Sequence, residues 1–271
     1  MGVEMNINVQ ADMLEGTKTV RQTVISADGS AKKTGAAVVR EHFLDVLVNE
    51  KKAVSLVCTP SDLAELVLGR LLTDKLISDA EDVESIYLCE KGAVARVFLK
   101  RDLVMEEDKE IRETTCCTGN RTFLKNSRGE PLPRMEKANW RPEWIFALTQ
   151  AFARDSKLHR ETAGTHSCYL SAGGSVLFHS EDIGRHNAMD KCIGYAVRKG
   201  IPRKDCILFT TGRVPTDMVQ KAIAAGIPVL VSKSVPTDAA VDMAAQYGLT
   251  LICRAWPDSF AVFSQSDETW T

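Results

Sequence analysis

Short apolar runs of strand type alternate with helical patterns through the second half of the chain, and this alternation most constrains the fold. Strands are predicted at residues 166–171, 175–178, 207–209, 229–231, 249–253 and 260–263, and helices at 185–198, 215–225 and 236–247. Because the connections are short, each helix must cross a face of the sheet between two strands. We therefore expect a largely parallel sheet in a three-layer α/β/α arrangement.

The first half of the chain has a different pattern, with hairpins in place of crossovers. Strand-like runs at 43–48 and 53–57, and again at 83–88 and 93–99, are each separated by a polar turn. Between these two pairs, Thr59 and Pro60 open an amphipathic helix, with Pro60 at its first position. These elements predict a smaller α+β domain.

These patterns divide the chain into four segments. Residues 1–35 show no sustained period and are expected to form an irregular N-terminal arm, and residues 36–113 form the smaller α+β domain. Residues 114–139 are polar and rich in loop-forming residues, which predicts a cysteine loop and linker. Residues 140–271, which begin with a helix opened by Pro142, form the larger α/β domain.

The composition argues against several classes of protein. A formal net charge of -2 over 271 residues does not suit a nucleic-acid binder, whose domain is usually basic. No apolar run approaches the roughly 18 residues of a membrane span, and residues 1–15 show no apolar block, so no signal peptide is predicted. The 8 cysteines are scattered, which fits reduced thiols that are mostly small buried hydrophobes. We expect a cytoplasmic protein.

Residues 181–191 concentrate ionisable and amide side chains at a strand-to-helix turn. Such turns face the ligand crevice in α/β sheets. If the helix starts near Arg185, His186 and Asp190 share a face with Asn187 close by, so that an imidazole, an amide and a carboxylate are presented together. The alternative is a solvated first helical turn, with acids before it and Lys191 further in.

Two later turns share a design that suits an anion. Residues 210–215 and 232–237 each follow a strand, supply hydroxyl groups and one cation, Arg213 or Lys233, and lead into a helix. The free N–H groups and the dipole at a helix N-terminus bind phosphate. Capping by Ser and Thr would explain one such turn as ordinary helix initiation. The chain has neither a P-loop nor a Rossmann glycine motif.

Cys116 and Cys117 are adjacent in the polar loop, between Arg112 and Arg121. An electropositive and accessible setting favours a reactive thiolate. The alternative is that the pair consists of two incidental loop thiols.

The spacing of cysteines and histidines predicts no zinc site. No C-x-x-C occurs in the chain, and the five histidines are dispersed. Only His166 and His186 lie in apparent site segments, whereas His42 is expected to be structural or at the surface.

Several ordered motifs of the chain occur together in one known family. They are residues 164–166, the run 181–191, residues 211–213 with Lys221, residues 232–234 with 236–237 and, in the first half, residues 59–62 and 68–69. By these motifs the chain, from about Phe43 to its C-terminus, resembles the formate dehydrogenase accessory sulfurtransferases, the FdhD family. The resemblance implies a larger domain similar to the cytidine deaminase fold, without the zinc site.

The resemblance also implies a function in sulfur transfer. In that family a loop cysteine receives a persulfide from a cysteine desulfurase and passes the sulfur to a molybdenum or tungsten cofactor, before the cofactor is inserted into the formate dehydrogenase catalytic subunit. The bis-molybdopterin guanine dinucleotide cofactor would be the bound client of the larger domain, with GDP as a mimic. The two turns suited to phosphate agree with such a ligand.

The family's loop commonly carries one cysteine in a Gly-rich sequence, or a C-x-x-C pair. Alignment on residues 114–115 and 122–123 makes Cys117 the persulfide carrier, with Cys116 where Gly or Ser is usual. Asn120 stands where a second cysteine would be. A resolving thiol at that position is therefore excluded, unless Cys116 takes its place.

The resemblance implies a set of cofactor-binding residues in the larger domain. Residues 254–259 belong to this set by position, but they depart from the family, which tends to be Gly- and Arg-rich in this segment and contacts the cofactor there. Trp256 is expected to stack on a guanine or a pterin, or else to pack as a rim aromatic. The full set is His166, Arg185, His186, Asn187, Asp190, Lys191, Thr211, Gly212, Arg213, Lys221, Ser232, Lys233, Ser234, Thr237, Arg254, Ala255, Trp256, Pro257, Asp258 and Ser259.

Two functions from different classes are consistent with these residues. The first is a sulfurtransferase in which Cys117 carries the sulfur, with the desulfurase and formate dehydrogenase as protein partners. The alternative is a chaperone that binds and delivers the guanine dinucleotide cofactor without sulfur transfer. A zinc deaminase, suggested by the fold alone, lacks the H-x-E and P-C-x-x-C signature. A symmetric homodimer is expected because it is the commonest oligomer.

Overall fold

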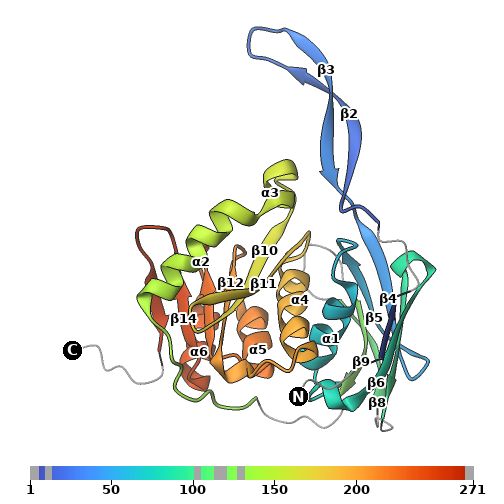
Figure 1. The fold of residues 1–271 in the computed structure, drawn as a ribbon, viewed down its shortest axis with the longest axis vertical. Coiled ribbons are helices and arrows are strands. Elements are labelled where there is room, and N and C mark those ends of the chain that lie inside the picture. The colour runs from blue at the N-terminus through green and yellow to red at the C-terminus, as the bar shows by residue number, and fades with distance from the viewer. Residues whose placement is uncertain (1–5, 10–13, 101–104, 113–120, 127–131, 266–271) are drawn as a thin grey trace.

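The computed structural model describes residues 6–9, 14–100, 105–112, 121–126 and 132–265 (Figure 1). Its six-stranded sheet has the order β11-β10-β12-β13-β14-β15. The strands are β10 (His166–Ala172), β11 (Ser175–Asp182), β12 (Cys206–Thr210), β13 (Val229–Ser232), β14 (Thr250–Cys253) and β15 (Ala261–Ser264).

The six-stranded sheet is mixed, so the prediction of a largely parallel sheet is wrong. Only β12, β13 and β14 run parallel, whereas β10, β11 and β15 pair antiparallel with their neighbours. Gly173 and Gly174, both with positive φ, connect β10 to β11. So short a connection can join only antiparallel strands.

Helices cover both faces of this sheet, which confirms the three-layer α/β/α prediction. The helices α2 (Pro142–Asp155) and α3 (Lys157–Thr162) lie on one side, and α4 (Arg185–Arg198), α5 (Thr216–Ala224) and α6 (Asp238–Tyr247) lie on the other (Figure 1). Alternate strand residues supply the two layers. Tyr169 and Phe209 share a buried cluster with Ile145 of α2, while Leu170 and Leu208 belong to the core beneath α4. The likeness to the cytidine deaminase fold stays a prediction.

A second, seven-stranded sheet has the order β1-β6-β7-β4-β5-β9-β8. One helix, α1 (Leu63–Thr73), lies between this sheet and α4 (Figure 1). Three short 3-10 helices, η1 (Ala80–Asp82), η2 (Glu90–Gly92) and η3 (Arg203–Asp205), occur in connections. The strands are β1 (Asn6–Val9), β4 (His42–Val48), β5 (Lys51–Cys58), β6 (Val83–Cys89), β7 (Val94–Leu99), β8 (Met105–Arg112) and β9 (Arg121–Asn126).

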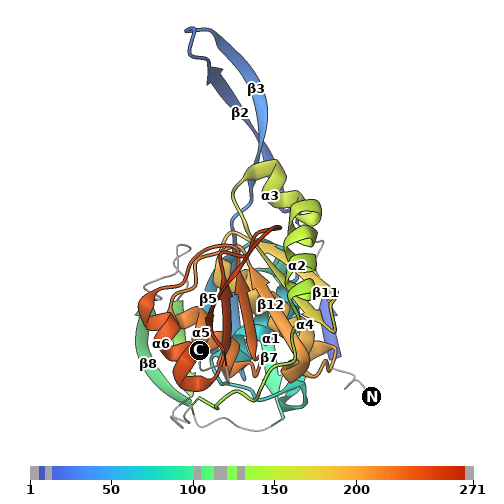
Figure 2. The same cartoon turned by 90° about the vertical axis from the view of Figure 1, so that its left-hand side faces the viewer.

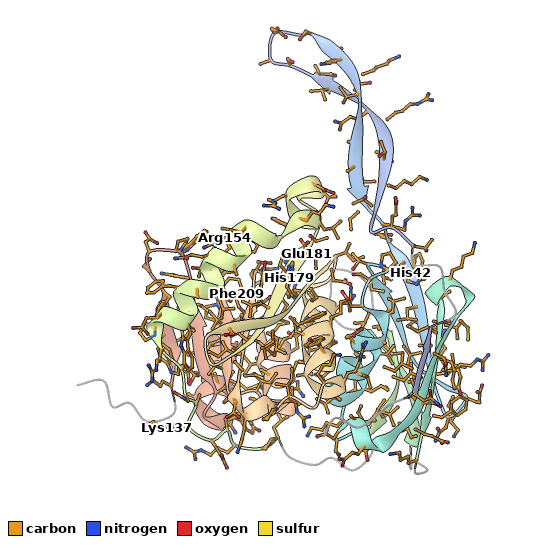
Figure 3. All side chains as sticks on the ribbon, in the orientation of Figure 1. His42, Lys137, Arg154, His179, Glu181 and Phe209 are labelled. Atoms are coloured by element: carbon orange, nitrogen blue, oxygen red, sulfur yellow. The ribbon has the colours of Figure 1, made fainter. Side chains whose placement is uncertain are left out.

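The two halves of the chain share one core, because α1 and α4 pack with their backbones in close contact. A Cβ added at Gly69 would lie 1.8 Å from the carbonyl oxygen of Asp190, and one at Gly194 would lie 1.8 Å from that of Glu65. One cluster of buried side chains then extends from the seven-stranded sheet through both helices to the six-stranded sheet. Side chains fill the space between these layers (Figure 3). The domain boundaries stay predictions.

The described part of residues 1–35 is regular, so the prediction of an irregular arm is wrong. β1 pairs with β6, and the strands β2 (Thr17–Ile25) and β3 (Ala31–Val39) form an antiparallel hairpin that projects from the body in both views (Figures 1 and 2). The hairpin was missed because it buries neither face, and its sequence therefore lacks the apolar alternation that marks a strand.

Two further boundaries differ from prediction. Strand β9 lies inside the predicted loop 114–139. Its residues show little strand pattern in the sequence, and pairing with β5 and β8 holds them in a strand. Helix α1 begins at Leu63 rather than Pro60, since Asp62 has a φ of 52° and Thr59 is bonded elsewhere. None of the described helices is long and apolar enough to cross a membrane.

Candidate functional site

Three polar segments meet at one edge of the six-stranded sheet. They are the polar run of residues 181–191 and the two turns that the sequence suggests for anion binding, residues 210–215 and 232–237. β11 is antiparallel to β10, which is antiparallel to β12, so β11 and β12 end at the same edge. Asp182 pairs with His166, and Thr210 pairs with both Cys168 and Ser232. This confirms that residues 181–191, 210–215 and 232–237 lie around the carboxyl ends of neighbouring strands, where α/β sheets bind ligands.

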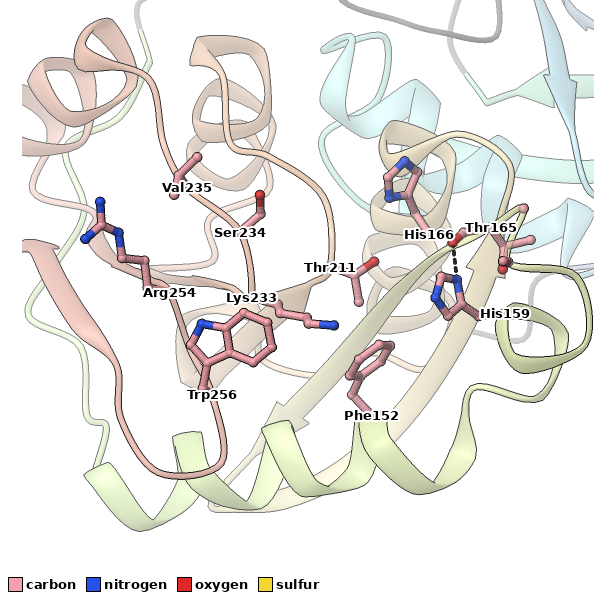
Figure 4. A pocket seen from close by; sticks show the side chains of 12 residues that line it. Phe152, His159, Thr165, His166, Thr211, Lys233, Ser234, Val235, Arg254 and Trp256 are labelled. Atoms are coloured by element: carbon pink, nitrogen blue, oxygen red, sulfur yellow. Dashed lines mark hydrogen bonds between the residues drawn. The ribbon is translucent and has the colours of Figure 1, made fainter. Parts of the chain in front are cut away.

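A cavity of about 720 Å³ opens at this edge (Figure 4). Its wall combines cations, imidazoles, hydroxyl groups and two aromatic rings, and none of its lining residues is acidic. Six of the predicted cofactor-binding residues line it, namely His166, Thr211, Lys233, Ser234, Arg254 and Trp256. Phe152, His159, Ala163, Gly164, Thr165 and Val235 also line it and were not predicted as cofactor-binding residues.

Lys233 lies between two aromatic rings of the cavity wall. Its Nζ is 4.9 Å from the ring centroid of Phe152 and 4.9 Å from that of Trp256 (Figure 4). Both distances suit cation–π attraction. The Trp256 side chain keeps 46% of its surface exposed. The rings therefore hold a positive charge at the cavity, and Trp256 keeps part of its surface accessible to a ligand.

The turn after β12 and the turn after β13 are joined by hydrogen bonds. The Val214 N–H donates to the Val235 carbonyl at 3.0 Å, and Ser232 Oγ donates to the Gly212 carbonyl at 2.6 Å. Gly212 has no room for a side chain, because an added Cβ would lie 2.9 Å from Cβ of Arg185. The predicted Gly212, Arg185 and Ser232 thus shape the turns rather than line the cavity.

Both helix N-termini at these turns already have acidic or capping groups of their own. At α5, Asp217 occupies the first turn and its Oδ2 lies 3.0 Å from Nε2 of His186. At α6, Oγ1 of Thr237 accepts from the N–H of Ala240. The capacity of the cavity to hold an anion therefore rests on Lys233 and Arg254 more than on the helix N-termini that the sequence suggested.

Two histidines line the cavity, His159 and His166. A backbone carbonyl fixes the first, and burial and a nearby charge shift the pKa of the second. His159 Nδ1 donates to the Thr165 carbonyl at 2.7 Å (Figure 4). Burial, followed by the positive charge of Arg185, lowers the pKa of His166. His166 is accordingly neutral near pH 7 and offers both a donor and an acceptor.

Glu181 of the polar run positions His159. Its carboxylate accepts from the N–H of Leu158 at 2.9 Å and from the N–H of His159 at 2.7 Å, which caps the start of α3. His159 could not be predicted as a site residue from sequence, because α3 and β11 come together only in the fold.

The centre of the polar run is buried in a network around Asp182. Its Oδ2 accepts from Lys191 Nζ at 2.7 Å and from the Thr59 N–H at 2.9 Å. Its Oδ1 accepts from the Gly184 N–H at 2.9 Å and from Asn187 Nδ2 at 3.0 Å. Asn187 and Lys191 thus join the start of α4 to the end of β5, and neither lines the cavity.

A second buried network joins α4 to α5 and α1. Lys221 Nζ lies 2.8 Å from Oδ2 of Asp190 and 2.8 Å from the hydroxyl of Thr73. Burial raises the pKa of Asp190, and the positive charge of Lys221 opposes that rise. Asp190, Lys221 and the buried His186 support the floor of the site, and they too lie outside the cavity lining.

The remaining predicted residues surround the cavity without lining it. Arg213 and Thr237 are exposed at the two turns, and Ala255 is buried. The Trp256 N–H donates to the Ser259 carbonyl at 2.8 Å, which closes a turn that includes Pro257 and Asp258. This turn orients Trp256 at the cavity rim.

Cys116 and Cys117 lie outside the described residues, but the strands on either side of them are placed. Arg112, at the end of β8, pairs with Arg121, at the start of β9, and Arg121 pairs with Ser55 of β5. β5 then ends at Cys58, directly before the Thr59 that Asp182 holds. Both ends of the cysteine segment therefore attach to the part of the seven-stranded sheet that leads to the site edge.

The cysteines in the described part of the chain have a structural character. Five of these six, Cys58, Cys168, Cys192, Cys206 and Cys253, are buried. Burial raises the pKa of Cys206 to about 11 and that of Cys253 to about 12, so both are thiols at neutral pH. These observations confirm that most cysteines act as small buried hydrophobes.

His42 is structural, as predicted. It is buried, and its Nε2 lies 2.7 Å from the Gly92 carbonyl oxygen. Within the described ranges, no three His, Cys, Asp or Glu side chains cluster so as to hold a metal ion.

The chain is similar to known proteins over most of its length. A model of the FdhD/NarQ family matches residues 39–269. The sulfur carrier protein FdhD of Halalkalibacterium halodurans is 30% identical over 243 residues, which cover 88% of this chain and 90% of that protein. The sulfur carrier protein FdhD of Staphylococcus haemolyticus is 29% identical, over 94% of this chain and 97% of that protein.

A solved structure has the same fold. It is a proposed formate dehydrogenase accessory protein from Desulfotalea psychrophila, with a TM-score of 0.74, 23% identity, and coverage of 92% of this chain and 97% of that chain.

Proposed function

The chain belongs to the FdhD/NarQ family, and from this membership and the cationic, aromatic cavity we propose that it is a sulfur carrier that serves formate dehydrogenase. Cys117 would accept a persulfide from a cysteine desulfurase. The cavity would hold the molybdenum or tungsten guanine dinucleotide cofactor that receives the sulfur. Relatives named as sulfur carrier proteins cover nearly the whole chain and support this role.

The observation that carries the proposal is the composition of the cavity wall. Lys233 and Arg254 suit phosphate oxygens, and the exposed ring of Trp256 suits a guanine or a pterin. The absence of acids among the lining residues removes the like-charge repulsion that a pyrophosphate would meet. Of the residues predicted to hold the cofactor, those that line the cavity are assigned this contact, and the buried ones are assigned to positioning.

The placement of β8 and β9 supports a carrier cysteine that works near the cavity. Arg112 and Arg121 pair at the sheet end that leads into Thr59, and Thr59 is bonded to Asp182 beside His166. The described residues on either side of the cysteine segment, Arg112 and Arg121, are thus attached to the part of the sheet that leads to the site edge.

Sulfur enters by an exchange without net oxidation. The Cys117 thiolate attacks the outer sulfur of the donor persulfide, and the donor cysteine leaves as a thiolate. Release of that sulfur to the cofactor as sulfide takes two electrons, which we assign to a thiol reductant or to the metal.

Mass spectrometry of the intact protein tests the carrier. Wild type, Cys116→Ala and Cys117→Ala are incubated with an active cysteine desulfurase and cysteine. We expect a sulfur adduct, removable by a thiol reductant, on wild type and Cys116→Ala and not on Cys117→Ala. If no variant acquires sulfur, the chain is instead a cofactor-delivering chaperone.

A further inference from the structure

The hairpin of β2 and β3 is a surface that neither the sulfur carrier chemistry nor the cavity uses. Its nine-residue strands, about 30 Å long at 3.4 Å per residue, pair with each other from Thr17↔Val39 to Ile25↔Ala31. They form a separate two-stranded sheet that projects from the body (Figure 2). The family match begins at residue 39, where the hairpin ends.

Two-stranded hairpins standing alone are marginally stable in water, so this one gains from a partner. Among the described residues, neither strand pairs with a strand of the two larger sheets, so the outer edges of β2 and β3 have no strand partner there. Val24 and Ile25 are 45% and 73% exposed near the tip. Exposed apolar side chains on an open strand edge mark an interaction surface.

The charge of the hairpin selects its partner. The two strands carry Lys18, Arg21, Lys32 and Lys33 and the turn between them adds one acid, Asp28, so the hairpin is net positive in a chain whose net charge is -2. An acidic protein surface would complement this charge. A second copy that paired its hairpin with this one would place like charges opposite each other, which is destabilising.

The base of the hairpin lies at the rim of the cavity. Val39, at the end of β3, has its Cγ1 3.1 Å from the position of a Cβ at Gly164, and Gly164 lines the cavity. Leu158 of α3 approaches to 3.7 Å from the Cβ position at Gly16, next to the start of β2. A protein bound along the hairpin is therefore held beside the cavity mouth.

We propose that the β2–β3 hairpin is the docking arm for the protein that receives the ligand of the cavity, and that it binds an acidic surface of that protein. The step rests on the proposed function, under which this acceptor is the formate dehydrogenase catalytic subunit. The cations of the arm attract the acceptor, and the strand edges together with the exposed Val24 and Ile25 bind it.

Binding of the apo catalytic subunit to the full-length protein tests the docking arm. Surface plasmon resonance compares wild type with a Lys32→Glu/Lys33→Glu double variant and with a Lys199→Glu/Lys204→Glu double variant, which reverses the same charge at exposed sites outside the hairpin. We expect the hairpin variant to bind about tenfold more weakly and the control to bind like wild type. The affinity of wild type should fall as salt rises.

Several results would overturn the docking arm. They are equal affinities of the two double variants, no binding by wild type, loss of binding to the desulfurase instead of the catalytic subunit, and a self-association that only the hairpin variant loses. Sulfur loading of Cys117 and GDP binding are measured on the same proteins. Neither measurement involves the hairpin. If wild type failed to load sulfur or to bind GDP, that result would count against the proposed function, and the affinity comparison would still test the docking proposal.

Discussion

Lys191 Nζ lies 2.7 Å from Asp182 Oδ2, and both side chains are completely buried. Removal of one partner leaves the other charge buried and unpaired in the interior. We therefore expect Lys191→Met to lower the free energy of unfolding by about 3–5 kcal/mol, measured by urea denaturation.

An exposed pair of the same chemistry provides the control. Lys52 Nζ lies 2.9 Å from Asp45 Oδ2, but each side chain is 44% exposed. Lys52→Met should change the free energy of unfolding by less than about 1 kcal/mol. Equal effects of the two substitutions would show that the Asp182 network does not depend on burial of its charges.

The contact between α1 and α4 leaves no room for a methyl group. Gly69→Ala would bring Cβ to 1.8 Å from the Asp190 carbonyl oxygen, so the helices must move apart. We expect a loss of about 3 kcal/mol or more in unfolding free energy. Gly16→Ala is the control, because its nearest atoms would be at 3.7 Å. A Gly69→Ala protein as stable as Gly16→Ala would contradict the close packing.

Stability should depend on pH through His166. Its pKa is lowered in the folded protein by burial and by Arg185, so below its ordinary value of 6.5 the unfolded chain binds more protons. The free energy of unfolding should then decrease as pH falls below that value, until the folded histidine is protonated too. His166→Gln should remove this part of the slope, as measured by urea titrations across the range. An unchanged slope would contradict a neutral His166.

Lys233 should dominate anion binding in the cavity. Lys233→Met removes the cation that lies between Phe152 and Trp256, and we expect it to weaken GDP binding about tenfold. Lys199→Met, a change of the same kind at an exposed position outside the cavity lining, should leave it unchanged. Calorimetry gives the affinities. Equal GDP binding by the two variants would remove Lys233 from the ligand contact.

The larger half of the fold could be predicted because its central strands are short, fully buried apolar runs and its helices carry a periodic apolar pattern. The periodicity of residues 185–198 located α4 with its observed bounds, Arg185–Arg198. The β2–β3 hairpin could not be predicted, because its side chains are largely exposed and show no apolar periodicity. Strand β9 could not be predicted either, because its strand conformation depends on pairing with β5 and β8.

The site was predictable as a location and less so as a set of side chains. Polar residues that line a cavity and polar residues that satisfy one another inside the protein look alike in sequence. Lys233 and Lys191 are both lysines in polar segments that follow a strand, yet Lys233 lines the cavity, whereas Lys191 lies in α4 and is bonded to Asp182. Phe152 and His159 come from α2 and α3, and only the tertiary fold brings them to the cavity.

Transfer of labelled sulfur tests the central claim most directly. Wild type and Cys117→Ala, each exposed to the desulfurase with isotopically labelled cysteine and then separated from it, are mixed with the guanine dinucleotide cofactor and apo formate dehydrogenase. We predict that wild type alone gives up labelled sulfur and restores formate oxidation. Full restoration by Cys117→Ala would contradict the account.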